Sequence, residues 1–264
     1  GTRFVQQDRQ HRAIDAAGNA ADDLFVADGF ADAFDDLALE IVDGGVMENV
    51  NISKVRMTTT NNPVFIRLGH RNADGPVGSI DGVTISDVTA EIPNRPKSEM
   101  DKFPSYWRHL CTTLITGSIT GLPGHPVRNV TLRNVAMAYG GIGDAPKPDH
   151  LLLENLEKIP ECAQSYPESK MFGVLPAWGL YCRHAEGLTF ENVTLRVSGR
   201  DYRAAVIFDD VRDLKLNRFD ILSAGRKPVM VLNDVARAAI IQCKQPGGVK
   251  WIDKRGGTKD VVVP

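Results

Sequence analysis

The chain has no long hydrophobic run, no excess of charge of either sign and few cysteines. No stretch approaches the ~18 consecutive apolar residues of a membrane-spanning helix, so we expect no membrane partner. The formal net charge is −2, so no overall field draws the chain toward nucleic acid. The 264 residues, 42% of them hydrophobic, are enough for one large domain with a sizeable core.

The cysteines lie far apart at Cys111, Cys162, Cys182 and Cys243. No CxxC pair indicates zinc or a redox dithiol, and no loop has the spacing of a dedicated calcium site. We therefore expect no metal and no cofactor. Buried free thiols are the first interpretation, and one disulfide is the alternative. Residues 1–4 show no basic and apolar leader, so no signal peptide is visible.

A short phrase of alternating apolar and polar residues around a polar corner recurs along the chain. Its copies occupy residues 49–57, 82–90, 129–137, 187–195 and 213–221. Because alternate side chains of a strand point to opposite faces, each copy predicts two short strands joined by a corner. One copy cannot bury its own apolar face, so we expect the copies to stack as a solenoid.

The spacing of the copies predicts which fold they build. Their first apolar residues are 33, 47, 58 and 26 positions apart, at Val50, Val83, Val130, Leu188 and Leu214. One turn of two or three strands needs about 20–28 residues, so the longer steps carry inserted loops. Further β-prone runs lie between the copies, at residues 63–69, 111–117, 180–184, 205–211 and 229–235. Without helical periodicity between them, these runs predict an all-β parallel β-helix, and they lack the helical halves of a leucine-rich repeat.

We expect the chain to divide into two regions. Residues 1–35 form an atypical N-terminal segment with a mild helical pattern that includes Ala13 and Ile14, either a helical cap or partly disordered. Residues 36–264 are the β-helix domain. Its insertions at 94–109 and 140–173 are rich in proline, glycine and charge, as surface loops are. The tail after Gln245 is a last strand or a cap, and an open end allows a homodimer.

Several segments follow one another in an order typical of one enzyme family. They are residues 37–45, 65–71, 115–117 with 121–126, 166–168 with 171–179, and 181–184. From about Leu37 to Leu222 the chain resembles the C-terminal part of bacterial family-28 glycoside hydrolases, the polygalacturonase-like pectin-degrading enzymes. The resemblance implies a right-handed parallel β-helix and an acidic polysaccharide substrate of galacturonate or rhamnogalacturonan type. It also implies hydrolysis with inversion and a secreted or periplasmic location.

The family's catalytic aspartate motifs lie N-terminal to the matched segments. The pairs Asp22–Asp23 and Asp35–Asp36 lack their strand context, and the family's Gly-His-Gly and Arg-x-Lys motifs have no counterpart here. The chain is therefore expected to be a glycoside hydrolase that uses other carboxylates, or an incomplete or inactive relative. The alternative is a non-catalytic polysaccharide-binding or structural module, and a calcium-dependent lyase of the same fold class is the third hypothesis.

Glycoside hydrolysis usually requires two carboxyl groups on either side of the scissile bond. Glu40 and Asp43, in a segment otherwise apolar enough to be core, are the candidate catalytic residues. For Asp43 the structural interpretation is that it fixes the turn at Gly44–Gly45 through its side-chain oxygen.

Cationic side chains at strand ends are the candidate substrate-binding residues. Arg67, inside an apolar strand, is either paired in the wall or directed at an anionic sugar. His70 and Arg71 would widen such a site. The other candidates are His125, which follows a tight turn and either binds a sugar hydroxyl or holds the turn, and the adjacent Arg183 and His184. Because neighbours in a strand alternate, at most one of Arg183 and His184 is expected to face a given groove.

Two further sets of residues have a structural interpretation. Trp178 and Tyr181 are expected to be core residues or loop anchors rather than sugar-stacking rings. Asp209–Asp210 and Asn233–Asp234 fall at the same offset in successive repeats. We expect them to satisfy corner groups of the backbone or each other.

Overall fold

The computed structural model describes residues 13–14, 36–93, 115–141, 155–222, 229–244, 247–248 and 250–263. Over these ranges the chain is all-β, and its helical structure is confined to the 3-10 turn η3 (Leu156–Lys158). None of the described segments is a helix long and apolar enough to cross a bilayer.

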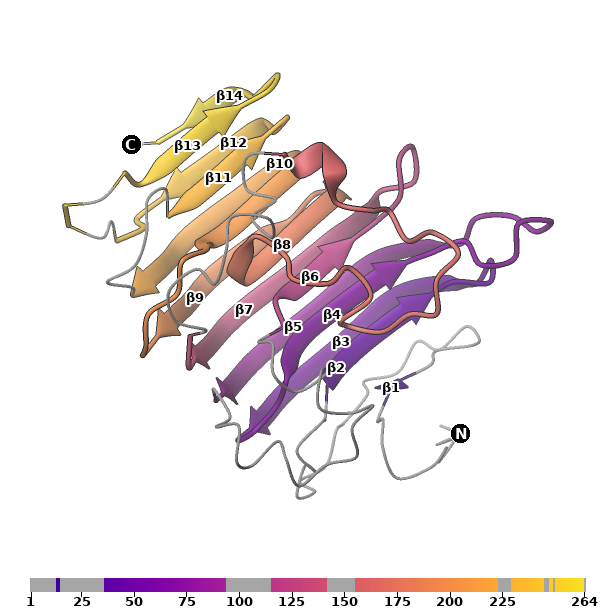
Figure 1. Cartoon of the computed structure of the whole chain (residues 1–264), viewed down its shortest axis with the longest axis horizontal. Coiled ribbons are helices and arrows are strands. Elements are labelled where there is room, and N and C mark those ends of the chain that lie inside the picture. Colours follow the sequence, from indigo (N-terminus) through magenta and orange to yellow (C-terminus); the bar gives the residue numbers. More distant parts are fainter. Residues whose placement is uncertain are drawn as a thin grey trace.

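The strands form two parallel ladders that share the long strand β10 (Ala204–Leu222) (Figure 1). The first ladder runs through β2 (Asp36–Ile41), β4 (Asn62–Leu68), β6 (Gly117–Thr120), β8 (Ala177–Glu186), β10, β11 (Met230–Asn233) and β13 (Ile252–Arg255). The second runs through β3 (Val46–Met57), β5 (Ser79–Ile92), β7 (Val127–Tyr139), β9 (Thr189–Val197), β10, β12 (Ala236–Ile241) and β14 (Lys259–Val262). Each repeat therefore contributes to both ladders.

The register of the second ladder matches the sequence repeat. Val83 of β5 lies opposite Val50 on one side and Val130 on the other. Further along, Phe190 of β9 lies opposite both Leu132 and Leu216. These pairings confirm the predicted alignment of the copies residue by residue. The register is strongly specified, since a slip by one position would turn every apolar side chain outward.

The main core packs residues from both ladders together, for example Leu39 and Ile66 of the first with Ile52 and Leu132 of the second. Alternate residues along each strand enter this core. Trp178 belongs to it as well, is 2% exposed and meets Tyr139 edge to face. Its interpretation as a core residue is confirmed.

Left-handed backbone recurs at the corners, where the sequence has mainly Asn, Asp and Gly. Asn49, Gly82, Asn129 and Gly187 have φ values from 53° to 75°, a region that these residue types tolerate best. At Gly187 a Cβ would meet Asn129 Oδ1 at 2.6 Å, so a larger residue would have to displace that side chain. A second corner carries a side-chain ladder, in which Asn192 donates to Asn134 and Asn134 donates to Asp87, both at 2.9 Å.

Other expectations have mixed outcomes. Of the run predicted at residues 111–117, positions 111–114 lie outside the described residues, and Ile115 and Thr116 precede the strand, β6, which begins at Gly117. Of the N-terminal segment, Ala13–Ile14 form strand β1 parallel to β2, so these positions are extended rather than helical. The tail does supply strands, β13 and β14.

Among the described cysteines, Cys162, Cys182 and Cys243 are free thiols.

Residues 155–176, which we call the strap, cover the outer face of the first ladder, in front of β4, β6 and β8 in Figure 1. The strap buries Leu156, Ile159, Phe172 and Leu175 in a second, smaller core. Strand residues that point away from the main core complete this cluster, among them Phe65, Tyr181 and Ile207. The expected surface loop of residues 140–173 is therefore, in its described part, a packed layer.

Candidate functional site

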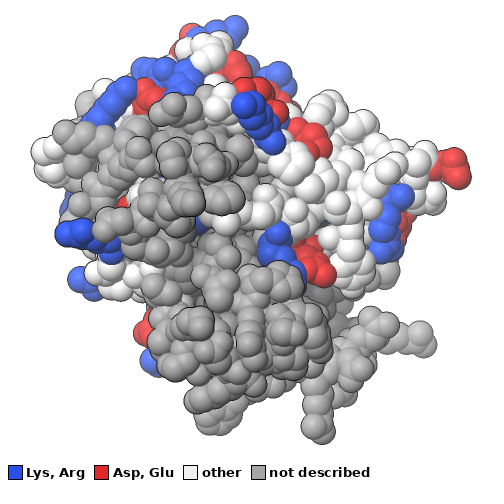
Figure 2. Space-filling model, in the orientation of Figure 1, with Lys and Arg blue, Asp and Glu red and all other residues white. Residues whose placement is uncertain are grey.

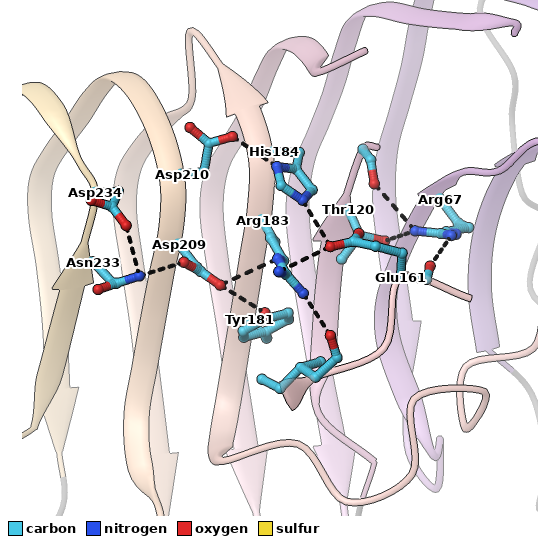
Figure 3. A network of polar contacts seen from close by, with 12 residues as sticks. Arg67, Thr120, Glu161, Tyr181, Arg183, His184, Asp209, Asp210, Asn233 and Asp234 are labelled. Atoms are coloured by element: carbon cyan, nitrogen blue, oxygen red, sulfur yellow. Dashed lines mark hydrogen bonds and ion pairs between the residues drawn. The ribbon is translucent and has the colours of Figure 1, made fainter. Parts of the chain in front are cut away.

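A row of polar side chains crosses the outer face of the first ladder, next to the apolar row that the strap covers. Each member lies in register with the next along neighbouring strands. The members of this polar row are Glu40, Arg67, Thr120, Arg183, Asp209, Asn233 and Arg255. Positive and negative groups therefore lie side by side across the ladder (Figure 3).

Arg67 holds the strap against the ladder. It is 1% exposed, and its Nη2 donates to the carbonyl oxygen of Glu161 at 2.6 Å. Its Nη1 lies 3.3 Å from both Thr120 Oγ1 and the Gly121 carbonyl oxygen. The guanidinium carbon lies 5.3 Å from the centre of the Phe172 ring, a cation–π contact. Burial lowers the pKa of Arg67 to about 10, so the side chain stays charged at neutral pH.

Arg183 joins the strap to strand β10. Its Nη2 lies 2.9 Å from Glu161 Oε1, and its Nη1 donates to the Ile159 carbonyl oxygen at 2.9 Å. Its Nε lies 3.3 Å from Asp209 Oδ2, which is close enough for an ion pair but is not aligned as a hydrogen bond. The guanidinium is thus committed to groups of its own chain.

Asp209 is the buried anion at the centre of the network. It is 5% exposed, and it accepts from the Tyr181 hydroxyl at 3.1 Å and from Asn233 Nδ2 at 2.7 Å. The structural interpretation of Asp209 and Asn233 is confirmed at this point, since Asn233 satisfies Asp209 across neighbouring repeats. Tyr181 is buried as an anchor, as expected, and burial is the main cause that raises its pKa well above its usual value.

His184 lies between two carboxylates. Its Nδ1 is 2.7 Å from Asp210 Oδ2, and its Nε2 is 3.2 Å from Glu161 Oε1. Ionised carboxylates only accept hydrogen bonds, so the ring donates to both of them only as an imidazolium, with a proton on each nitrogen. Burial alone would lower the pKa of His184, but the bonds to Glu161 and Asp210 outweigh it and raise the pKa above 6.5. Burial likewise opposes the ionised form of Glu161, yet the hydrogen bond from His184 and the charges of Arg183 and Arg67 hold its pKa below its usual value.

A groove of about 450 Å³ opens beside this network, between the strap and the last strands of the first ladder. The strap contributes Leu156 and Glu157. The strand side contributes Arg183, His184, Asp209, Asp210, Asn233, Asp234 and Arg255. Both Arg183 and His184 therefore line one groove, contrary to the expectation that at most one would. The reason is that left-handed backbone at His184, φ 50°, breaks the alternation at the strand corner.

The two candidate catalytic residues do not line this groove. Glu40 is the member of the polar row opposite Arg67, at the far end from the groove. Asp43 lies outside the strand on the surface, where Arg71 Nε donates to its Oδ1 at 3.1 Å and Arg71 Nη2 pairs with its other oxygen. That ion pair lowers the pKa of Asp43. Neither carboxylate lines the groove with Asp209 and Asp210 of β10 or with Asp234, which follows β11.

The remaining candidates lie elsewhere. His70 Nε2 lies 3.0 Å from the Gly75 carbonyl oxygen, and His70 lines an open pocket of about 500 Å³ with strap residues 162–165. His125 is exposed at the end of a tight turn, where its backbone pairs with Leu122. Arg71 lies on the surface next to Tyr166.

Glu161 and Arg255 are site residues that sequence reasoning missed. Glu161 lies in an insertion without periodicity, and nothing in the sequence indicates that it returns to β8. Asp210 and Asp234 were noticed as equivalent positions but interpreted as structural only, whereas both line the groove. The sequence did contain one signal for them, because Asp210 and Asp234 each follow an apolar run at the same position of successive repeats.

Figure 2 shows basic and acidic side chains interspersed over the described part of one face, rather than a continuous field of one sign. Recognition at the groove therefore depends on the local arrangement of charges. Comparison of the chain with protein-family models, curated proteins and solved structures found no match.

Proposed function

We propose that the chain winds as a right-handed parallel β-helix and binds acidic polysaccharide of galacturonate or rhamnogalacturonan type in the groove beside the strap. Parallel register supports this fold, as does the offset of only 24 residues between Val206 and its partner Met230. A step this short leaves room for two or three short strands and their corners, and for little else.

The observation that carries the ligand class is the mixed lining of the groove. Asp210 has a side chain 40% exposed, and Asp234 lies at the equivalent corner of the next repeat. Asp210 already pairs with His184, and Asp234 accepts from the Gly257 amide at 2.6 Å. A carboxylate has about four acceptor positions, so both can also accept hydrogen bonds from sugar hydroxyls.

Arg183 is paired with Glu161 and Asp209, and Arg255 is paired with Asp253. Both arginines still bring positive charge to the groove, which suits the carboxylate of a uronate residue. A groove that combines both kinds of group suits a polyhydroxylated anion better than a neutral or purely acidic ligand.

Hydrolysis is the activity that the resemblance adds, and Asp210 and Asp234 are the carboxylates that we assign to it. They are contributed by adjacent parallel strands, which lie ~4.8 Å apart. Side chains one or two strand spacings apart can reach the ~6.5–9.5 Å separation of an inverting pair. One carboxyl would protonate the leaving oxygen while the other activates water.

The test is to measure binding and reducing-sugar release together, with polygalacturonate and rhamnogalacturonan as ligands. We expect the wild-type chain to bind, and Asp210→Asn to lower release by at least ~100-fold, the usual contribution of an acid or base. Asp213→Asn is the matched control, since Asp213 also lies in β10 with left-handed backbone but does not line the groove. Absence of binding to either polymer would overturn the proposal.

The second candidate is a non-catalytic polysaccharide-binding module, and one observation favours it. The carboxylates nearest to Arg183 are already used, because Asp209 and Glu161 are paired with cations of the chain and the pKa of Glu161 is lowered. Binding without sugar release would decide for this module. Calcium-dependent formation of an unsaturated product would decide for a lyase. For all three functions we propose a secreted or periplasmic location, where such polymers are met.

A further inference from the structure

Tyr166, in the middle of the strap, presents its aromatic ring to solvent. It is 67% exposed, the most exposed of the large apolar residues in the described part of the chain. Tyrosine is enriched at contact surfaces because its ring offers an apolar face and its hydroxyl a polar tip.

The ring is held from one side by charged groups that neutralise each other. The Arg71 guanidinium carbon lies 5.8 Å from the centre of the Tyr166 ring. Arg71 in turn makes a two-pronged ion pair with Asp43, whose hydrogen bonds raise the pKa of Arg71 and lower that of Asp43. Tyr166 thus contacts an arginine whose position and charge are both fixed by its ion pair with Asp43.

The backbone on either side of this support is fixed as well. The amide of His70 donates to the Ala163 carbonyl oxygen at 2.7 Å, and the amide of Ser165 donates to the Cys162 carbonyl oxygen at 3.1 Å. The first bond ties the strap to the segment that follows β4, and the second closes a turn of the strap directly before Tyr166. The pocket of about 500 Å³ is lined by His70 and by residues 162–165, which directly precede Arg71 and Tyr166 in the two chain segments.

We propose that Tyr166 and this pocket form a second sugar subsite, which takes one sugar ring by its apolar face. The C–H face of the ring packs on Tyr166, and its hydroxyls meet the polar groups of Gln164 and Ser165. Because Asp43 compensates Arg71, the subsite does not select for a negative charge. It therefore accepts a neutral or methyl-esterified sugar as well as a uronate.

This inference rests on the proposed function, since it assigns a further position on the same polymer. Strand β4, which ends three residues before Arg71, and strand β8, which carries Arg183, are separated by β6 alone. Two strand spacings are ~10 Å. A glycan that runs along the ladder from the groove can therefore reach the tyrosine with its next residues.

Calorimetric titration with galacturonan oligosaccharides of one length, in free-acid and methyl-esterified forms, tests the subsite. We expect Tyr166→Ala to weaken binding about fivefold or more for both forms, equally at low and high salt, as for a stacking contact of ~1 kcal/mol. Tyr166→Phe keeps the ring and should bind within about twofold of wild type. Unchanged thermal unfolding of both variants would show that the fold is kept, as the exposure of the side chain leads us to expect.

The outcomes separate the two proposals. If wild type binds and Tyr166→Ala binds equally well, the subsite is overturned and the proposed function stands. If Tyr166→Ala weakens only the free-acid form, the subsite selects for charge and the inference is wrong. If wild type binds neither oligosaccharide, both proposals are overturned.

Discussion

Asp201 and Arg203 form a buried ion pair in which Arg203 Nε and Nη2 each lie 3.0 Å from a carboxylate oxygen of Asp201. Their side chains are 0% and 1% exposed. Arg203 also reaches the Leu175 carbonyl oxygen at 3.4 Å, so the pair fastens the end of the strap where β10 begins.

Removal of one partner should be far worse than removal of both. We expect Asp201→Ala to lower the free energy of unfolding by roughly 3–5 kcal/mol, because it leaves a buried guanidinium unpaired. The double variant Asp201→Ala with Arg203→Met should recover part of this loss, since no charge then remains buried. Urea denaturation of the three proteins measures both effects. A loss below about 1 kcal/mol in the single variant would contradict the burial described here.

Stability should fall at mildly alkaline pH because of His184. Its pKa in the folded chain is raised above 6.5 by Glu161 and Asp210, against burial and the charge of Arg183. A raised pKa stabilises the fold fully below the unfolded value, and this contribution is lost as pH rises through the folded value. We therefore expect the free energy of unfolding of the wild type to decrease from about pH 6.5 upward.

His184→Asn is the matched control for this pH dependence, since asparagine tolerates the left-handed backbone at this corner. The variant should be less stable at pH 6 by roughly 1.5–3 kcal/mol, the value of hydrogen bonds to charged groups. It should also lose the decrease between neutral and alkaline pH. On the acidic side the wild type should lose stability as pH falls through the lowered pKa of Glu161, and the variant should lose less, because the hydrogen bond from His184 is the main cause of that lowering. Parallel pH profiles above pH 6.5 would count against the imidazolium.

Arg67→Met should release the strap while it keeps much of the packing against Phe172. The Glu161 carbonyl oxygen, 2.6 Å from Arg67 Nη2, would lose its partner. An unsatisfied buried group costs about 1–3 kcal/mol, so cleavage within residues 155–176 should become faster. Limited proteolysis followed by mass spectrometry detects this change. The exposed Arg56→Met on the second ladder should leave the cleavage pattern as it is in wild type, and equal patterns for both variants would contradict the role given to Arg67.

Arg218→Asn should stabilise the chain. Arg218 has φ 51°, a left-handed conformation that costs an ordinary side chain roughly 1–2 kcal/mol. It follows Asp87, Asn134 and Asn192 at the equivalent corner, and an asparagine there would extend their hydrogen-bonded ladder. We expect the melting temperature to rise, and Gly187→Ala, at another left-handed corner, to lower it. A drop with Arg218→Asn would show that its ion pair with Glu191, at 3.7 Å, outweighs the backbone strain.

The repeat could be predicted because its signal is local and periodic. Alternation fixes which residues of each copy enter the core, and the corner residues fix where each strand bends, so the pairing of Val50 with Val83 follows from the sequence. The start of β6 at Gly117 is not visible in the sequence, because Ile115 and Thr116 have the composition of a strand and yet precede it. Composition alone does not set strand ends.

The site was less predictable because it depends on contacts between distant segments. Arg67 was recognised as a charge within an apolar strand, but its partner Glu161 stands 94 positions later in a segment without periodicity. The same segment decides that Tyr181 is covered and that Asp210 lines a groove. A side chain at a strand end can serve the backbone or a ligand, and only the covering layer distinguishes the two.

The repeats nearest the C-terminus are linked by the shortest connections, so a folding chain can close them first. Leu216 pairs with Ile240 only 24 positions away, whereas Leu132 pairs with Phe190 across 58 positions. The longer closure costs about 0.8 kcal/mol more in chain entropy. In pulse-labelled refolding, the amide of Leu216 should therefore become protected before that of Leu132. The C-terminal strands would then serve as the nucleus onto which the earlier part of the molecule assembles.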